Sequence, residues 1–256
     1  NQYQEGHAEQ LQQLEDIWSD RLPAGWEETV PVFEPDEKGM ATRVSSGHVL
    51  NGVAEGLPWL LGGSADLATS TMTLLNADGM GEFSAADPAG RNFHFGIREH
   101  GMAAIANGLA LGGLRSYVAT FFVFTDYLRP SLRLSSLMGL PVLYVMTHDS
   151  IGLGEDGPTH QPVEHLAACR AIPGVQVIRP ADANEVAEAY RVAISAGGPT
   201  VFVLTRQGLP TLDRADYGAA SGVGRGGYVL RDSGEGEPQV LLLGTGSEVA
   251  ICLAAQ

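Results

Sequence analysis

The sequence predicts an α/β fold: a doubly wound, mainly parallel sheet with helices on both faces, followed by the truncated start of a second α/β domain. Two observations carry this prediction. Between residues 41 and 210, short apolar runs of strand length alternate with longer segments of helical periodicity. The runs are apolar throughout, as in PVLYVMT at 141–147, which is typical of strands buried on both faces.

The N-terminal region is expected to be a helix followed by a linker. Leu11, Leu14 and Trp18 recur at helical spacing within residues 5–20. The segment that follows is rich in proline, glycine and acidic residues, which favours an irregular connection. We therefore assign residues 1–40 to a helix and a linker outside the main sheet.

The first half of the main domain alternates helix and strand. The expected elements are a helix at 45–55, an apolar run at 57–63, a polar loop at 76–92, a short strand near Phe95, a helix ending at Gly112-Gly113 and a strand at 115–120. The glycine pair is a typical signal for the C-terminal end of a helix. This order is the one that a parallel sheet with crossover helices requires.

The second half continues the pattern. The expected elements are a helix at 125–139, a strand at 141–147, a long polar loop at 148–162, a helix at 163–172, a strand at 175–180, a helix at 182–198, a strand at 200–205 and a turn to Pro210. Asp182, followed three residues later by Glu185, has the spacing of a capping box at a helix start.

The rest of the chain is expected to lie outside this domain. Residues 41–210 form one complete domain, and residues 211–238, rich in glycine and acids, form an interdomain linker. QVLLLGTGSEVAICLAAQ then predicts a strand and a helix at 239–256. One strand and one helix cannot enclose a core, so we expect this last unit to be incomplete, and the chain to be a fragment or a subunit.

Composition excludes several classes of protein. The 256 residues include 15 Lys and Arg against 30 Asp and Glu, a net charge of -15, which disfavours binding to nucleic acid or to an anionic membrane. Two cysteines cannot form a disulfide scaffold and suit a reducing compartment. We find no apolar run long enough to span a bilayer and no signal peptide, and we therefore expect a cytoplasmic protein.

Polar clusters follow four of the expected strands. They are Ser64-Ala65-Asp66, Arg98-Glu99-His100, the loop from His148 to His160, and Arg206-Gln207. In a doubly wound sheet, chemistry gathers in the loops at the carboxyl ends of the strands. These clusters therefore predict an active site along that edge of the sheet.

Familiar motifs do not explain these clusters. The glycines at 152 and 157 have the spacing of a phosphate-binding loop, but Pro158 stands where that loop requires lysine. Gly244-Thr245-Gly246 lacks the third glycine of a dinucleotide fingerprint, and no serine-hydrolase motif occurs. We assign no metal ligand, although His148, Asp149, Asp156 and His160 could in principle form a mononuclear site.

Glu99 and a group of aromatic residues each allow two interpretations. Glu99 begins an apolar helix, where an acid is favoured by the helix dipole, but a half-buried carboxylate there could also exchange a proton with a heterocycle. Phe121, Phe122, Phe124 and Tyr127 would ordinarily be core residues. Because they directly follow a strand, they could also form a wall against a flat ligand.

Four segments resemble the middle, pyrimidine-binding domain of the transketolase family. They are FGIREHGMAAIANG, THDSIGLGEDGPTHQP, RPADANEVAEAY and LTRQGLP, and the resemblance covers about Ala41 to Pro210. It implies the thiamine-diphosphate-binding fold and transfer of a two-carbon ketol unit from a ketose phosphate to an aldose phosphate, in the pentose phosphate pathway of carbohydrate metabolism.

The resemblance also implies cofactor contacts. Glu99 matches the glutamate that hydrogen-bonds the aminopyrimidine of thiamine diphosphate and so promotes formation of the ylid. Aromatic side chains would surround the pyrimidine, with an acid and a histidine nearby; these positions are Phe121, Phe124, Tyr127, Asp66 and His160.

On the substrate side, the resemblance implies that His148 and His160 assist proton transfers at the ketose oxygens, while Asp156 binds a sugar hydroxyl. Arg43, Ser70 and Arg206 match the family's sugar-phosphate anchors. Two guanidiniums and a hydroxyl suit a phosphate, even on an acidic protein.

One departure limits these expectations. The family's GDG signature, which belongs to the domain that binds the diphosphate and Mg²⁺ or Ca²⁺, is absent here. We therefore expect the metal ligands in another domain, an inactive isolated chain, and an active site shared with that domain in a homodimer. A dihydroxyacetone synthase-like enzyme and a non-catalytic module with the same fold are the alternatives.

Overall fold

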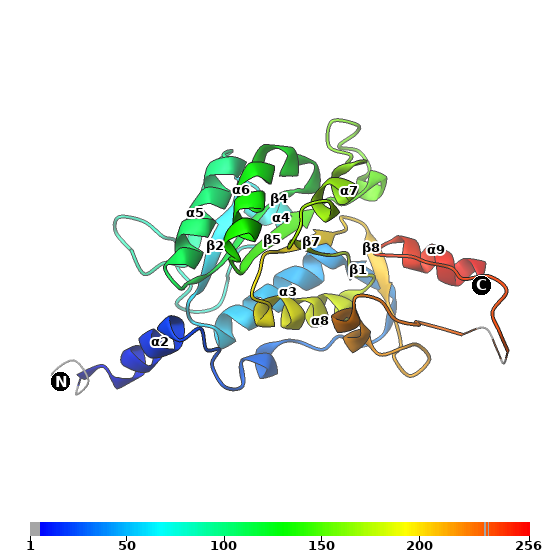
Figure 1. Ribbon diagram of the computed structural model, residues 1–256, viewed down its shortest axis with the longest axis horizontal. Coiled ribbons are helices and arrows are strands. Elements are labelled where there is room, and N and C mark those ends of the chain that lie inside the picture. Colours follow the sequence, from blue (N-terminus) through cyan, green and yellow to red (C-terminus); the bar gives the residue numbers. More distant parts are fainter. Residues whose placement is uncertain (1–5, 233, 235) are drawn as a thin grey trace.

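The computed structural model describes residues 6–232, 234 and 236–256, and it contains a six-stranded parallel sheet (Figure 1). The strand order is β3-β2-β4-β5-β7-β6. The strands are β2 Leu60–Ser64, β3 Asn92–His94, β4 Arg115–Phe121, β5 Val142–Thr147, β6 Gln176–Ile178 and β7 Thr200–Leu204. Because all neighbouring pairs are parallel, every carboxyl end lies at the same edge, as the sequence predicted.

Helices cover both faces of this sheet (Figure 1). The helices of the described residues are α2 Ala8–Trp18, α3 Thr42–Gly56, α4 Ala68–Thr71, α5 Glu99–Leu111, α6 Thr125–Met138, α7 His165–Arg170, α8 Ala183–Ser195 and α9 Glu248–Ala255. Of these, α3 and α8 pack on one face, and α5 and α6 on the other. Short 3₁₀ turns are η1 Trp26–Thr29, η2 Phe122–Phe124, η3 Ile151–Leu153 and η4 Ala220–Arg225. The alternation of strand and helix is the predicted one.

Two separate apolar cores show that the sheet is doubly wound. In β5, Leu143 and Val145 belong to a core with α3 and α8, whereas Tyr144 and Met146 belong to a second core with α5 and α6. Successive strand residues point to opposite faces, so a strand buried on both faces needs apolar residues at nearly every position. This is why the central strands have no polar–apolar alternation.

Helix ends follow the sequence signals. Gly113, with φ +88°, and Gly139, with φ +64°, follow the ends of α5 and α6 in the left-handed region that glycine adopts without strain. The Asp182 carboxylate accepts a hydrogen bond from the Glu185 backbone N–H at 2.8 Å and caps α8. Glu185 reaches back to the N–H of Ala181, one residue before the capping residue.

A two-stranded sheet forms where we expected only a linker and a turn. Strand β1, Asp36–Ala41, pairs antiparallel with β8, Gly208–Thr211. The polar sequence DEKGMA carries no strand signal, and its partner lies far along the chain, so the pair could not be seen locally. At Gly39 a Cβ atom would lie 1.7 Å from the Leu209 carbonyl oxygen, which explains the glycine. The expected boundary at residue 41 thus falls inside this strand pair.

The C-terminal prediction was wrong in one respect. Residues 239–243, expected to form a strand, pair with no strand among the residues that the structure describes. Their side chains are largely exposed; Leu243, for example, is 90% exposed. A strand needs a neighbour to satisfy its backbone groups, and apolar sequence alone does not supply one. The helix that follows, α9, is present as predicted.

The flanking segments are tied to the domain. Arg214, in the expected interdomain linker, pairs with Asp182 at 2.6 Å, and Asp20, beyond α2, pairs with Arg115 at 2.8 Å. The first five residues of the expected N-terminal helix and linker, and positions 233 and 235, lie outside the described residues. Within the part described, no helix combines the length and apolarity required to span a membrane.

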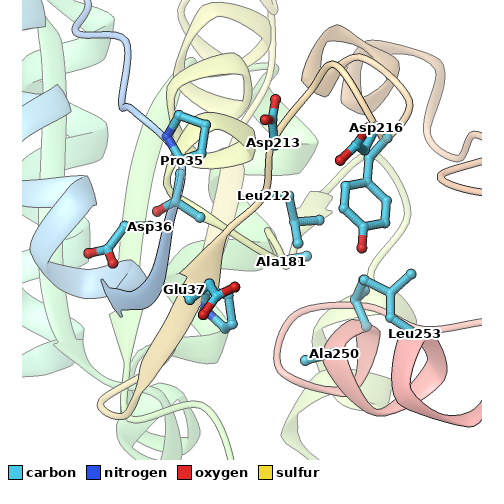
Figure 2. Close-up of a pocket in the computed structure, with 13 residues that line it drawn as sticks. Pro35, Asp36, Glu37, Ala181, Leu212, Asp213, Asp216, Ala250 and Leu253 are labelled. Carbon is cyan, nitrogen blue, oxygen red and sulfur yellow. The ribbon is translucent and has the colours of Figure 1, made fainter.

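A cleft of about 550 Å³ lies between this two-stranded sheet and α9 (Figure 2). Pro35 and Glu37 line one side, Leu212 and Tyr217 another, and Leu253 of α9 closes it. None of the residues that we predicted for the active site lies among its walls.

Candidate active site

The predicted site residues gather at the carboxyl edge of the sheet. Asp66 follows β2, Phe121 ends β4, His148 follows β5 and Arg206 follows β7. Asp66 and His148 both have left-handed backbone angles, with φ +63° and φ +60°. Such angles are costly for residues with a Cβ atom and persist where the surroundings fix them, often at functional sites.

His148 is the centre of the cluster. Its side chain is almost fully buried, and its ring stacks on Phe121 with 3.7 Å between centroids. The Nε2 atom lies 3.5 Å from Arg43 Nη1 and 3.9 Å from Asp156 Oδ2, while Nδ1 is 2.9 Å from the Thr147 hydroxyl. Both ring nitrogens therefore face polar groups inside a buried pocket.

Burial lowers the pKa of His148 to about 4. The positive charges of Arg43, Arg206 and His160 contribute to this lowered pKa after burial, and the Asp156 carboxylate opposes them. At neutral pH the ring is therefore uncharged, with one nitrogen able to accept a proton and the other able to donate one.

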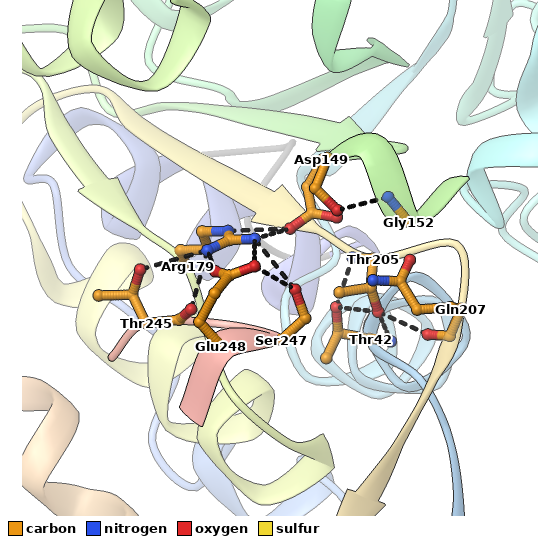
Figure 3. Close-up of polar contacts among 10 residues, drawn as sticks. Thr42, Asp149, Gly152, Arg179, Thr205, Gln207, Thr245, Ser247 and Glu248 are labelled. Carbon is orange, nitrogen blue, oxygen red and sulfur yellow. Dashed lines mark hydrogen bonds and ion pairs between the residues drawn. The ribbon is translucent and has the colours of Figure 1, made fainter. Parts of the chain in front are cut away.

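Arg43 and Arg206 each follow a threonine, and Figure 3 shows that these two threonines are bonded to each other. The backbone N–H of Thr42 donates to the Thr205 hydroxyl at 3.0 Å, and the N–H of Thr205 donates to the Thr42 hydroxyl at 2.7 Å. We call this reciprocal pair the threonine clasp. It fixes the residues immediately before Arg43 and Arg206, and so sets where the two guanidiniums begin.

The arginines lack a full set of partners. Burial and the nearby charge of Arg206 lower the pKa of Arg43. The Arg43 Nε atom is buried with no hydrogen-bond acceptor among the described residues. Arg43 Nη1 donates to the backbone carbonyl of Ser70 at 2.7 Å, and Arg206 pairs with exposed Glu155 at 2.8 Å. Ser70 thus contacts its neighbour through its carbonyl, not through the hydroxyl we singled out.

An aromatic wall continues from His148. Phe121 stacks with Phe124 at 5.9 Å, and Phe124 lies 6.1 Å from the ring of Tyr127, which is 64% exposed. The His160 ring meets the edges of Phe121 and Phe124 at 6.1 and 5.5 Å. The structure therefore joins both predicted histidines to the predicted aromatic residues.

Glu99 and Asp66 stand apart from this cluster. Glu99 is the first residue of α5, and its side chain is largely buried. Over residues 6–232, 234 and 236–256, no hydrogen bond or ion pair to its carboxylate is found. The Asp66 side chain is exposed and equally unpartnered within the same residues.

The alternative metal site is not assembled. Asp149 turns away from His148 and pairs with Arg179 at 2.7 Å. In the described part of the chain, the ligand atoms that come together belong to another set, Asp126, Glu164 and His165. Asp126 already bonds Arg129 at 2.9 Å, and this cation disfavours a second one.

Sequence reasoning missed the threonine clasp and the Asp149–Arg179 pair. The first had a readable signal, since the dipeptide Thr-Arg occurs at both 42–43 and 205–206. The second had none, because which of two adjacent residues faces the site depends on the backbone turn at His148.

Comparisons with known proteins identify the family of this chain. Residues 38–211 match the model of the transketolase pyrimidine-binding domain. The chain is 53% identical to a transketolase of Geobacillus stearothermophilus and 52% identical to one of Bacillus subtilis. Each comparison covers 99% of this chain and 38% of the relative, so the chain spans well under half of their length.

Solved structures show the same likeness. A Pichia stipitis transketolase in complex with sedoheptulose-7-phosphate superposes with a TM-score of 0.91 at 39% identity, over 99% of this chain and 38% of that one. A split-gene transketolase, described as an inactive β4 tetramer, gives a TM-score of 0.55 at 32% identity, over 68% and 54%. On the family match and this likeness, the chain belongs to the transketolase family and contains its pyrimidine-binding domain.

Proposed function

We propose that this chain supplies the pyrimidine-binding half of a transketolase active site, which moves a two-carbon ketol unit from a ketose phosphate to an aldose phosphate. One observation carries the proposal: a buried, uncharged His148 lies between a partly unpartnered arginine and an aromatic wall. A neutral proton carrier beside a cationic pocket suits a phosphorylated sugar with reacting oxygens. The pentose phosphate pathway follows from the resemblance and a cytoplasmic location from the composition of the sequence, and both stay part of the proposal.

The residues present fit the pyrimidine half of thiamine diphosphate. The Glu99 carboxylate is unpartnered among the described residues, and exposed ring surface is available at Tyr127 and Phe124. An acid that can hydrogen-bond a ring nitrogen and a wall of π-faces suit a flat aminopyrimidine. When bound, the cofactor supplies a nucleophilic carbon at its thiazolium ring. Glu99 would hold a proton at a pyrimidine nitrogen, and Asp66 would lie near the cofactor.

The substrate residues would act in three ways. Arg43 and Arg206 would bind the sugar phosphate, with Ser70 shaping the Arg43 side of the pocket. Asp156 would accept a hydrogen bond from a sugar hydroxyl. His148 and His160 would move protons at the carbonyl and hydroxyl oxygens of the ketose.

The proposal includes partners. We place the diphosphate site and the ligands for Mg²⁺ or Ca²⁺ in a separate domain, because the matched relatives are more than twice as long as this chain. We also propose a homodimer. Large apolar side chains are exposed along α5 and α6, which lie beside each other (Figure 1), and just before α5. They are Ile105, Leu111, Leu134 and Leu137 on the helices and Ile97 before α5.

The experiments also separate the proposed function from two alternative functions. A dihydroxyacetone synthase-like enzyme would use the same site with a different acceptor, and a panel of acceptors separates the two. A non-catalytic module would retain the fold without the chemistry. The lowered pKa of buried His148, together with its place beside Arg43 and Asp156, favours catalysis.

The test is ketol transfer by the complete enzyme that carries this chain. Glu99→Ala is expected to lower kcat by a factor of about 10² to 10⁴, the usual contribution of a proton-transferring group. Glu55→Ala, an exposed acid of α3, is the matched control and should leave kcat unchanged. An unchanged kcat in Glu99→Ala would contradict the proposed role, and an inactive parent enzyme would favour the non-catalytic module.

A further inference from the structure

We propose that Arg179 is a positioning residue that ties the segment before α9 to the backbone turn that orients His148. The proposal rests on the proposed function only in taking His148 as the proton carrier. The structural coupling itself can be tested without catalysis. The proposal is based on the hydrogen bonds and ion pairs of Arg179, in which none of the predicted site residues takes part (Figure 3).

On one side, the Arg179 guanidinium forms an ion pair with the Asp149 carboxylate. Its Nε and Nη2 atoms lie 2.8 and 2.7 Å from Asp149 Oδ2. The side chain of Asp149 is fully buried and that of Arg179 nearly so. Asp149 follows β5 and Arg179 follows β6, so the pair crosses the carboxyl end of β7, which lies between those strands. The Asp149–Arg179 ion pair therefore lies at the same edge of the sheet as the threonine clasp.

On the other side, Arg179 holds the start of α9. Its Nη1 donates to the carbonyl of Thr245 at 2.8 Å, and its guanidinium also bonds Ser247 and both carboxylate oxygens of Glu248. The backbone of Gly246 donates to the Arg179 carbonyl at 3.0 Å. A Cβ atom at Gly246 would lie 2.8 Å from the Arg179 side chain, so glycine makes this close approach possible.

The consequence for His148 follows from chain connectivity. His148 precedes Asp149 directly and holds a left-handed backbone angle of φ +60°. The second oxygen of Asp149, Oδ1, is buried without a partner, so Arg179 is the only side chain that the described structure provides for this carboxylate. Without Arg179, the buried charge would be uncompensated, and Asp149 would either take up a proton or move toward water and carry the turn with it.

Such a movement would change what His148 contacts. The ring is held by the Thr147 hydroxyl and by stacking on Phe121, both of which require the present backbone turn. The charged or titratable groups that face it are Arg43 of α3, Arg206 after β7, and Asp156 and His160 of its own loop. Arg179 is not among them, so an effect of Arg179 on His148 would act through position and not through direct charge.

The experiment measures His148 by NMR in the 256-residue chain labelled with ¹³C-histidine. In the parent chain, the His148 ring proton should be shifted by the Phe121 ring current, and the ring should titrate near pH 4. Arg179→Met should remove the ring-current shift and raise the pKa of His148 by about one unit or more, because the ring gains water. Arg191→Met removes a different ion-paired arginine, on α8, and is the matched control. It should change neither the ring-current shift nor the pKa of His148.

Two further variants measure the contribution of the α9 side and replace Arg179→Met if that variant does not fold. Glu248→Gln keeps Asp149 paired and should give a smaller change of the same sign, which shows that the α9 side contributes. If Arg179→Met does not fold, the double variant Arg179→Met/Asp149→Asn takes its place. It leaves no buried charge but also removes the bonds that hold the turn, so it should give a smaller change of the same sign. An unchanged His148 shift and pKa in a folded Arg179→Met or double variant would overturn the proposal.

Kinetics separate this proposal from the proposed function. In the complete enzyme, Arg179→Met should lower kcat by about ten- to a hundredfold, the usual effect of a misplaced catalytic group, with the KM for the sugar phosphate nearly unchanged. An NMR change together with an inactive parent enzyme would refute the proposed function and support the coupling. A full kcat with an NMR change would refute the positioning role.

Discussion

The His148 end of the candidate site and its Glu99 end are built to different degrees within this chain. At the His148 end, the threonine clasp fixes the residues before the two arginines, and the ring is held by stacking on Phe121 and by the Thr147 hydroxyl. At the Glu99 end, the carboxylate has no partner among the described residues. The Tyr127 ring, at the outer end of the aromatic wall, is likewise mostly exposed.

The difference suggests which half of the chemistry each end serves. Groups that must be held in place before a small substrate arrives are fixed by the fold itself. Groups that would meet a larger cofactor and a second protein surface present unpaired polar atoms and exposed rings. The unpaired carboxylate and the exposed ring thus belong to a surface that would meet the cofactor and another domain, and they do not show that this domain is incompletely folded.

The largest expected contrast is between two aromatic residues of the wall. Phe121→Ala should lower the free energy of unfolding by about 3 to 5 kcal/mol, because its ring is buried against His148. Tyr127→Ala should change it by less than about 0.5 kcal/mol, because the ring is exposed. Urea denaturation of both variants measures the two losses of unfolding free energy. Equal losses would contradict the difference in packing between Phe121 and Tyr127.

A second contrast is the dependence of stability on pH. The pKa of His148 is about 4 in the folded chain and 6.5 as its ordinary value, so the unfolded chain binds the proton more readily. The stability lost by this residue as the pH falls from 6.5 to 4 is therefore on the order of 3 kcal/mol, and none is lost above that window. His148→Gln should show a correspondingly flatter profile in denaturation from pH 7 to pH 4. A slope equal to that of the parent would show that the histidine is not held neutral.

The smallest expected effect concerns the threonine clasp. Thr205→Val removes the hydroxyl that Thr42 and the Gln207 carbonyl contact, and should cost about 1 to 3 kcal/mol of stability, since these buried groups lose their partner. Thr205→Ser keeps the hydroxyl and should lose less. If valine were as stable as serine, the clasp would not be what fixes Arg43 and Arg206.

The fold was largely predictable because its central strands have one structural explanation. A run such as Val142–Thr147, apolar at nearly every position, has to be covered on both faces, and the helical segments between such runs supply the cover. The strand pair of β1 and β8 escaped prediction because its stability comes from backbone pairing between distant segments. The expected strand at 239–243 failed for the opposite reason, since it has apolar sequence but no neighbour to pair with.

The site was predictable in outline and not in detail. Parallel topology brings the strand ends to one edge, which groups the polar clusters, and the resemblance assigns roles to particular residues. Which of two adjacent side chains enters the site is set by local backbone angles, as the opposite directions of His148 and Asp149 show. The same limit applies to Ser70, whose carbonyl faces Arg43.

The most direct test of the central claim, that this chain forms the pyrimidine half of a shared cofactor site, is a calorimetric titration with thiamine diphosphate and Mg²⁺. The chain alone should show no saturable binding at micromolar concentrations, and the complete enzyme should show it, with a loss of at least about tenfold in affinity or activity in Glu99→Ala. Tight, saturable binding by the 256-residue chain alone would contradict the account.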